Sequence, residues 1–135
     1  MIDLDLSGKR AVLTGASLGI GAAAVRALAD QGAKVWFCSR DKGNVAALAD
    51  YRPPSGDGSV RGVAADMADR ASVDAFLDAV QADGPVDILV NNVGASPSRN
   101  FLYMSDDDWA SLFELNLMSA VRCTRRLLPA MRERK

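Results

Sequence analysis

Apolar and polar positions along the chain form a repeating pattern of short apolar runs followed by longer amphipathic segments. The short runs have the length and composition of buried strands, and the longer segments carry apolar residues at helical spacing. We therefore expect strands at 10–13, 34–39, 60–65 and 86–91, and helices at 22–31, 44–51, 69–82 and from 105 to about 132. A strand before each helix predicts an α/β fold, a Rossmann-like doubly wound parallel sheet of about four strands with helices on both faces.

Local signals mark the ends of these elements. Gly32 is typical of a helix C-terminus. Ser105 precedes three aspartates, which predicts an N-cap and an acidic first turn for the last helix. We expect that helix to bend near Pro129, and residues 52–58 to form a loop because they are rich in proline and glycine. Residues 1–135 contain no linker or repeat and predict one dinucleotide-binding domain.

Composition excludes several classes of function. Hydrophobic residues make up 49% of the chain and the net charge is −1, so nothing indicates a nucleic acid or an anionic membrane as partner. The absence of histidine excludes a Ser-His-Asp triad, a Cys-His dyad and His-ligated zinc, and no metal site is expected. No apolar run is long enough to span a bilayer and the N-terminus lacks the basic start of a signal peptide, so we expect a cytoplasmic protein. We expect Cys38 and Cys123 to be buried small hydrophobes without a disulfide.

A glycine-rich segment, TGASLGIG at residues 14–21, joins the first predicted strand to the first predicted helix. Its glycines allow a tight turn and let a pyrophosphate approach the backbone without meeting a Cβ. The helix N-terminus that follows offers free N–H groups and a partial positive charge. The spacing is G-x-x-x-G-x-G, which differs from the common G-x-G-x-x-G fingerprint, and a plain loop is the alternative. The flanking strand and helix favour a phosphate site.

Polar residues also follow the second strand, at the end of the sheet where such folds bind their ligands. Ser39 and Arg40 occupy the position where a site that selects NAD usually holds an acid. A guanidinium there can bind a 2′-phosphate through two hydrogen bonds. Together with Ser17 from the glycine turn, these residues predict NADP as the cofactor, with NAD less favoured. The alternative is a surface arginine beside Asp41.

The third and fourth strands and the last helix add further candidates. Asp66 and Met67 follow the third strand, where the carboxylate could accept a hydrogen bond from an adenine amino group. Residues 91–94, Asn-Asn-Val-Gly, follow the fourth strand and could meet the ribose or the pyrophosphate. Asn116 interrupts an apolar stripe on the last helix, so we expect a buried amide that requires partners; a structural amide bonded to backbone is the alternative. The stripe consists of Trp109, Leu112, Phe113, Leu117, Ala120, Val121 and Thr124.

At these spacings the motifs resemble the N-terminal half of a classical short-chain dehydrogenase/reductase, over essentially all 135 residues. The resemblance rests on residues 14–21, Asp66, residues 91–94, Asn116 and the LLPAM sequence at 127–131. It implies an oxidoreductase that transfers hydride between NADP(H) and a small carbonyl or alcohol substrate, and a homo-oligomer in the full-length form. It also implies that Asn116 is the family's catalytic asparagine, which holds a water in a proton relay. The cofactor-binding candidates, from the residues and the resemblance together, are Gly15, Ser17, Leu18, Gly19, Ile20, Gly21, Ser39, Arg40, Asp66, Met67, Asn92 and Gly94.

The chain departs from the family pattern in two respects. Leu18 stands where many NADP-preferring members have a basic residue, so the NADP prediction rests mainly on Arg40. The family donates a proton from a Tyr-x-x-x-Lys pair, but serine and aspartate stand four residues beyond Tyr51 and Tyr103. We therefore expect a truncated or clipped fragment of a reductase that is inactive alone. The alternatives are a non-catalytic nucleotide-binding module that needs a partner chain, or a degenerate product kept as an interaction surface.

Overall fold

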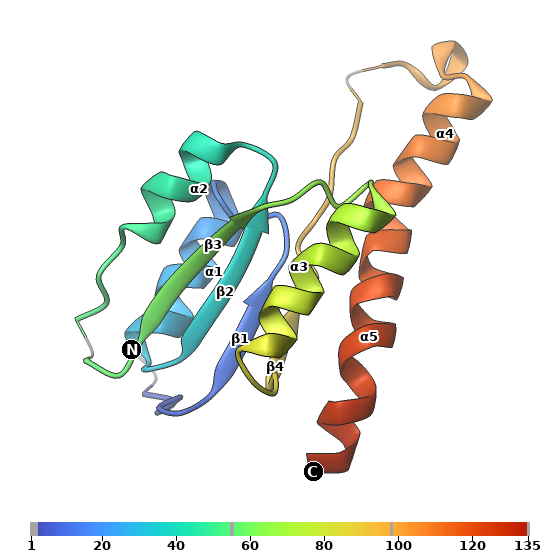
Figure 1. Cartoon of the computed structure of the whole chain (residues 1–135). Coiled ribbons are helices and arrows are strands. Elements are labelled where there is room, and N and C mark those ends of the chain that lie inside the picture. Colours follow the sequence, from blue (N-terminus) through green and yellow to red (C-terminus); the bar gives the residue numbers. More distant parts are fainter. Residues whose placement is uncertain (1–2, 55, 98, 135) are drawn as a thin grey trace.

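The computed structural model describes residues 3–54, 56–97 and 99–134 of the chain. Its sheet has four parallel strands in the order β3-β2-β1-β4 (Figure 1). The strands are β1 (Arg10–Leu13), β2 (Lys34–Ser39), β3 (Ser59–Ala64) and β4 (Ile88–Val90). This topology confirms the predicted α/β fold. The fourth strand is shorter than the predicted 86–91 because its ladder is limited by the short strand β1, its only pairing partner among the described residues.

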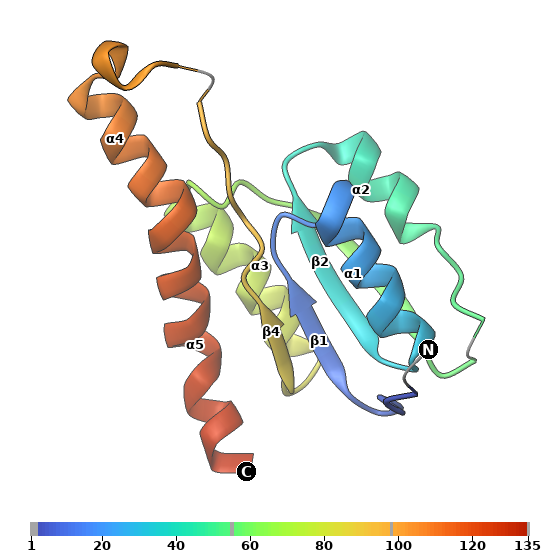
Figure 2. The ribbon, with the colours of Figure 1, turned by 180° about the vertical axis from the view of Figure 1, so that it is seen from behind.

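Helices cover both faces of the sheet. They are α1 (Gly19–Asp30), α2 (Lys42–Ala49), α3 (Arg70–Ala82), the 3-10 turn η1 (Phe101–Tyr103), α4 (Asp106–Phe113), the π-helical turn η2 (Glu114–Met118) and α5 (Ser119–Arg134). Figures 1 and 2 show α1 and α2 on one face of the sheet and α3 and α5 on the other. None of the helices within the described ranges is both long and apolar enough to cross a membrane.

Alternating strand residues build a separate core on each face. Leu13 and Phe37 are buried with Val25 of α1 on one side of the sheet. On the other side, Cys38 packs with Cys123 in a core that also contains the apolar face of α3. Both cysteines are buried and free, which confirms the prediction made from their sequence context. The predicted apolar face of the third helix is also confirmed, because Val73, Phe76, Leu77 and Val80 are all buried.

The helix that precedes the nucleotide-site candidates begins earlier than the sequence predicts. The apolar pattern places its start at residue 22, whereas α1 begins at Gly19 and therefore includes Gly21 in its first turn. Glycine is a poor helix former, so the apolar pattern alone assigns Gly19 and Gly21 to the loop before the helix. The helix ends at Asp30, and Gly32 follows with a φ of +94°, which confirms the predicted glycine stop.

The predicted last helix is divided into three parts. Ser105 caps α4 in a capping box with Asp108, as the acidic first turn indicated. The π turn η2 then separates α4 from α5, and no sequence pattern predicted this change of helical type. Pro129 lies inside α5, which continues through it to Arg134.

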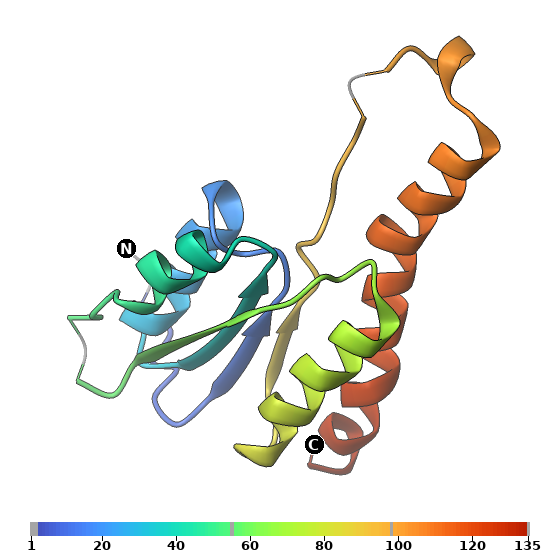
Figure 3. The ribbon, with the colours of Figure 1, turned by 45° about the horizontal axis from the view of Figure 1, so that its top comes forward.

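The apolar stripe on this long helix is not a buried core, contrary to the prediction. Trp109 is 39% exposed, Phe113 58% and Leu117 50%. The other stripe residues, Leu112, Ala120, Val121 and Thr124, are only partly buried. Figure 3 shows the reason: α4 extends past the sheet and past α3. The neighbouring η1 contacts it through an edge-to-face pair of the Phe101 and Trp109 rings, with centroids 5.8 Å apart, and this contact leaves most of the stripe open. Periodicity identifies an apolar face, but burial requires a neighbour.

Candidate functional site

Residues at or beyond the ends of all four strands, together with α1 and η2, meet at the carboxyl edge of the sheet around a pocket of about 290 Å³. Most of the cofactor-binding candidates line it: Gly15, Leu18, Ile20, Gly21, Ser39, Arg40, Met67, Asn92 and Gly94. Ser17, Gly19 and Asp66 are not part of its lining. The remaining lining residues, Ala65, Val93, Ala95 and Leu115, were not among the cofactor-binding candidates, although Val93 lies in the predicted segment 91–94. The first three adjoin predicted positions, whereas Leu115 reaches the pocket only through tertiary packing and has no local signal.

The glycine turn needs glycine for two different physical reasons. Gly15 and Gly19 have φ values of +64° and +56°, in the left-handed region that side chains disfavour. At Gly21 the limit is space, because a Cβ would lie 2.6 Å from Asn92 Nδ2 and 2.7 Å from Ala16 Cα. The turn is therefore pressed against the end of β4 too closely to admit a methyl group.

A small hydrogen-bond network holds the end of β4 against this turn. The buried Thr14 hydroxyl accepts hydrogen bonds from the backbone N–H groups of Asn92, at 3.2 Å, and Val93, at 3.4 Å. The Asn92 amide in turn donates to the Gly15 carbonyl at 2.9 Å. Asn92 therefore braces the turn as well as lining the pocket. Thr14 is a supporting residue that sequence reasoning did not assign to the site.

The N-terminus of α1 borders this pocket, which Leu18, Ile20 and Gly21 line. Its N-cap is Leu18, whose side chain makes no capping hydrogen bond. The first N–H groups of a helix have no partner within the helix, and a phosphate is well suited to accept from them. Leu18 and Ile20 are 66% and 85% exposed, so the entrance to this end of the pocket is open.

The end of β2 supplies a polar pair and a free cation. Ser17 Oγ donates to Ser39 Oγ at 2.7 Å, so the glycine turn and β2 meet as predicted. Arg40 lines the pocket and forms no ion pair within residues 3–54, 56–97 and 99–134. The neighbouring Asp41 is occupied elsewhere, because its carboxylate accepts the Asn44 N–H at 2.7 Å and caps α2. Arg40 is exposed, so the alternative of a surface arginine beside Asp41 stays open, although the two side chains form no ion pair among the described residues.

The two candidates after β3 take different positions. Met67 is 3% exposed, and its Sδ lies 3.5 Å from Cys38 Sγ, so it forms part of the pocket's apolar floor. Asp66 is exposed, and its carboxylate accepts the Ala68 N–H at 2.9 Å.

Burial raises the pKa of the Cys38 thiol to about 12, so that thiol is neutral at physiological pH and is no nucleophile.

Asn116 lies in η2 and contacts the segment that follows β4. Its Oδ1 accepts the Ala95 N–H at 2.8 Å, and its Nδ2 donates to the carbonyls of Ala95 at 2.9 Å and Leu112 at 3.1 Å. The residue is exposed, which corrects the prediction that it is buried. The reason is the same lack of cover that exposes the stripe. Its amide is bonded to backbone, as the structural alternative requires, and it reaches the pocket through Ala95.

Comparisons with known proteins agree with this architecture. The family model for short chain dehydrogenases matches residues 9–135. The uncharacterized oxidoreductase YvrD of Bacillus subtilis is 38% identical over 130 residues, which are 96% of this chain and 49% of that protein. The 3-oxoacyl-[acyl-carrier-protein] reductase FabG of Escherichia coli is 35% identical over 133 residues, which are 98% of this chain and 53% of that protein.

Solved structures give the same result. A structure of L-sorbose reductase from Gluconobacter frateurii, complexed with NADPH and L-sorbose, superimposes with a TM-score of 0.90 at 36% identity, over 98% of this chain and 51% of that one. A short-chain dehydrogenase/reductase variant from Serratia marcescens superimposes with a TM-score of 0.86 at 32% identity, over 94% and 52%. The chain thus spans about half the length of these relatives. With a family match that extends over residues 9–135, the chain belongs to the short chain dehydrogenase family.

Proposed function

We propose that this chain is the NADP(H)-binding half of an oxidoreductase that transfers hydride between the cofactor and a small carbonyl or alcohol substrate. The observation that carries the proposal is one pocket lined both by the N-terminus of α1, which has no side-chain cap, and by Arg40, which forms no ion pair in the described part of the chain. The first suits a pyrophosphate and the second a 2′-phosphate. The NADPH present in the L-sorbose reductase structure supports a nicotinamide cofactor.

Each part of the pocket has a proposed role in holding the dinucleotide. The backbone of the glycine turn would hold the pyrophosphate, and Leu18 and Ile20 would flank it. The Ser17–Ser39 pair and Arg40 would hold the 2′-phosphate. The other proposed contacts are Asp66 and Met67 with the adenine, and Asn92 and Gly94 with the ribose. The bound cofactor supplies the hydride chemistry, and these residues bind and orient it.

We also propose a division of labour within the reaction. Neither Tyr51 nor Tyr103 is followed by a lysine four residues later, so these 135 residues hold no family-type proton donor. Asn116 is the chain's proposed contribution to the proton relay. Its hydrogen bonds to Ala95, a lining residue, support a position at the edge of the pocket. On this proposal the chain binds the cofactor and does not turn it over.

A calorimetric titration of the full chain tests the binding proposal. NADP⁺ and NAD⁺ are titrated separately, and 2′,5′-ADP and 5′-AMP serve as a matched pair that differs only in the 2′-phosphate. We expect saturable binding at one site per chain, with NADP⁺ bound more tightly than NAD⁺ and 2′,5′-ADP more tightly than 5′-AMP. A lack of saturable binding by any of the four ligands overturns the proposal.

A homo-oligomer in the full-length form is also part of the proposal. The support is the exposed apolar surface that α4 and η2 present through Trp109, Phe113 and Leu117, since contiguous apolar patches mark interaction surfaces. Sedimentation velocity of the full-length protein tests it. We expect a dimer or tetramer that Leu117→Asp dissociates, and a monomeric full-length protein would refute it.

A further inference from the structure

A second pocket, of about 270 Å³, lies between α3 and α5, which run side by side in Figures 1 and 3. It shares no lining residue with the nucleotide pocket. Its lining residues are Arg70, Asp74, Met118, Arg122, Arg125 and Arg126. Four arginines and one aspartate thus line one small pocket, whereas the chain as a whole has a net charge of only −1.

Two of these arginines have acidic partners. Arg126 pairs with Asp78 and, at 3.8 Å from Nη1, with Asp74, the carboxylate that lines the pocket; it also donates from Nε to Gln81 Oε1 at 2.8 Å. Arg122 Nη1 lies 2.9 Å from Glu114 Oε2, but this nitrogen is buried and forms no hydrogen bond among the described residues. The ion pair therefore neutralises the charge of Arg122 and leaves part of its N–H donor capacity unused.

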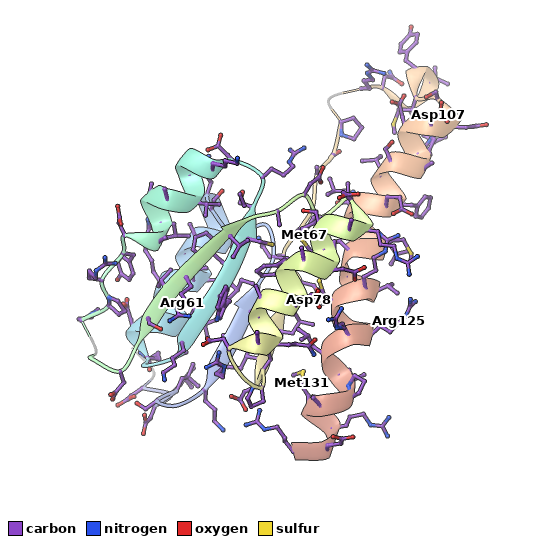
Figure 4. All side chains as sticks on the ribbon, viewed as in Figure 1. Arg61, Met67, Asp78, Asp107, Arg125 and Met131 are labelled. Carbon is purple, nitrogen blue, oxygen red and sulfur yellow. The ribbon has the colours of Figure 1, made fainter. Side chains whose placement is uncertain are left out.

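The other two arginines keep their full charge. Arg70 and Arg125 are exposed and form no ion pair in the described part of the chain. Arg70 is also the first residue of α3, where the helix dipole adds a partial positive charge. Figure 4 labels Asp78 on α3 and Arg125 on α5, the two helices that flank the pocket. Arg70 and Arg125 both line the same pocket, and an anion between like charges is stabilised by both.

We propose that the pocket between α3 and α5 binds the phosphoryl group of a small molecule at a site separate from the nucleotide pocket. Guanidinium groups match a tetrahedral oxyanion because each can present two parallel N–H donors. A single exposed ion pair contributes little, but the convergence of Arg70, Arg122 and Arg125 from two helices provides several donors to one ligand. This ligand would bridge the start of α3 to the middle of α5.

Thermal unfolding of the full chain, with inorganic phosphate as the probe at constant ionic strength, tests the site. Arg125→Gln removes a pocket charge, and Arg132→Gln is the matched control, since Arg132 is exposed on the same helix and does not line the pocket. Arg40→Gln reports separately on phosphate bound in the nucleotide pocket. We expect phosphate to raise the Tm of the parent, R132Q and R40Q proteins. R125Q should need about tenfold more phosphate for the same shift, because it lacks one charged hydrogen bond.

Three results would overturn the proposal. They are no phosphate-dependent shift in the parent chain, the same response in R125Q as in R132Q, and loss of the response in R40Q alone. Arg70→Gln is the second pocket variant if R125Q fails to fold, and we expect it to weaken phosphate binding to a similar extent. R40Q changes the nucleotide pocket and leaves the pocket between α3 and α5 intact. Failure of this inference can therefore be told apart from failure of the proposed cofactor site.

Discussion

Removal of the Arg40 side chain should weaken NADP(H) binding and leave NAD(H) binding unchanged. The side chain is exposed, lines the nucleotide pocket and forms no ion pair within the described residues. Arg40→Ala therefore breaks no contact that holds the fold, and surface changes of this kind shift stability by about 0.5 kcal/mol or less. The effect should fall on the ligand that carries a 2′-phosphate.

The exposure of Arg40 sets the expected size of this loss. A hydrogen bond to a charged group contributes about 1.5–3 kcal/mol, which corresponds to a loss of about 10- to 150-fold in affinity. An exposed guanidinium is screened by salt, so we expect the lower end of this range at physiological ionic strength. The loss should shrink further as salt is added.

The assay is a fluorescence titration of the parent chain and R40A with NADPH and with NADH, at low and at high salt. Lys42→Ala is the matched control, because it removes a positive charge two residues away that does not line the pocket. An equal loss of NADH and NADPH affinity in R40A would refute the assignment of the 2′-phosphate. A K42A protein that behaves like R40A would show that the effect is long-range charge alone.

Three further predictions concern the turn, the acid stability and the thiols. Gly21→Ala should destabilise the chain by about 1–3 kcal/mol and weaken nucleotide binding, because the new Cβ would lie 2.6 Å from Asn92 Nδ2. Urea unfolding measures the loss of stability. The control is Gly56→Ala, which should change stability little because the space around Gly56 is open. The Trp36 indole and Arg10 hold the pKa of Asp83 below its usual value, so their contribution to stability is present at neutral pH and is lost as the pH falls through that lowered pKa. Asp83→Asn should therefore flatten the acid side of the stability profile, and an unchanged profile would contradict this account. Burial raises the pKa of Cys38 to about 12 and that of Cys123 to about 11, so a thiol reagent at pH 8 should modify both slowly in the native chain and rapidly in denaturant; fast native labelling would show that these thiols are accessible.

The alternation of apolar and polar residues was sufficient to predict the sheet and its helices. The strands β1 and β2 carry apolar runs that are largely buried, and α3 shows its apolar face at regular spacing. The glycine turn was recognisable because its backbone demands are local: positive φ at Gly15 and Gly19 restricts the residue type at those positions. The meeting of Ser17 with Ser39 also followed from the topology, since parallel strands end at one edge.

Features that depend on long-range packing were not predictable. The support that Thr14 gives to Asn92 joins residues far apart in the sequence. Leu115 lines the pocket from the π turn η2, and that turn has no pattern in the sequence. The stripe on the last helix predicted burial of Asn116, but periodicity cannot show whether a neighbour covers the face. Each of these features depends on contacts between residues distant in the sequence, and the local sequence does not specify such contacts.

A crystal structure of the full chain with NADP⁺ tests the central claim most directly. The account predicts the pyrophosphate at the N-terminus of α1 and the 2′-phosphate within hydrogen-bond distance of Arg40, with the adenine beside Met67. A dinucleotide bound elsewhere, or one whose 2′-phosphate points away from Arg40 into solvent, would contradict it.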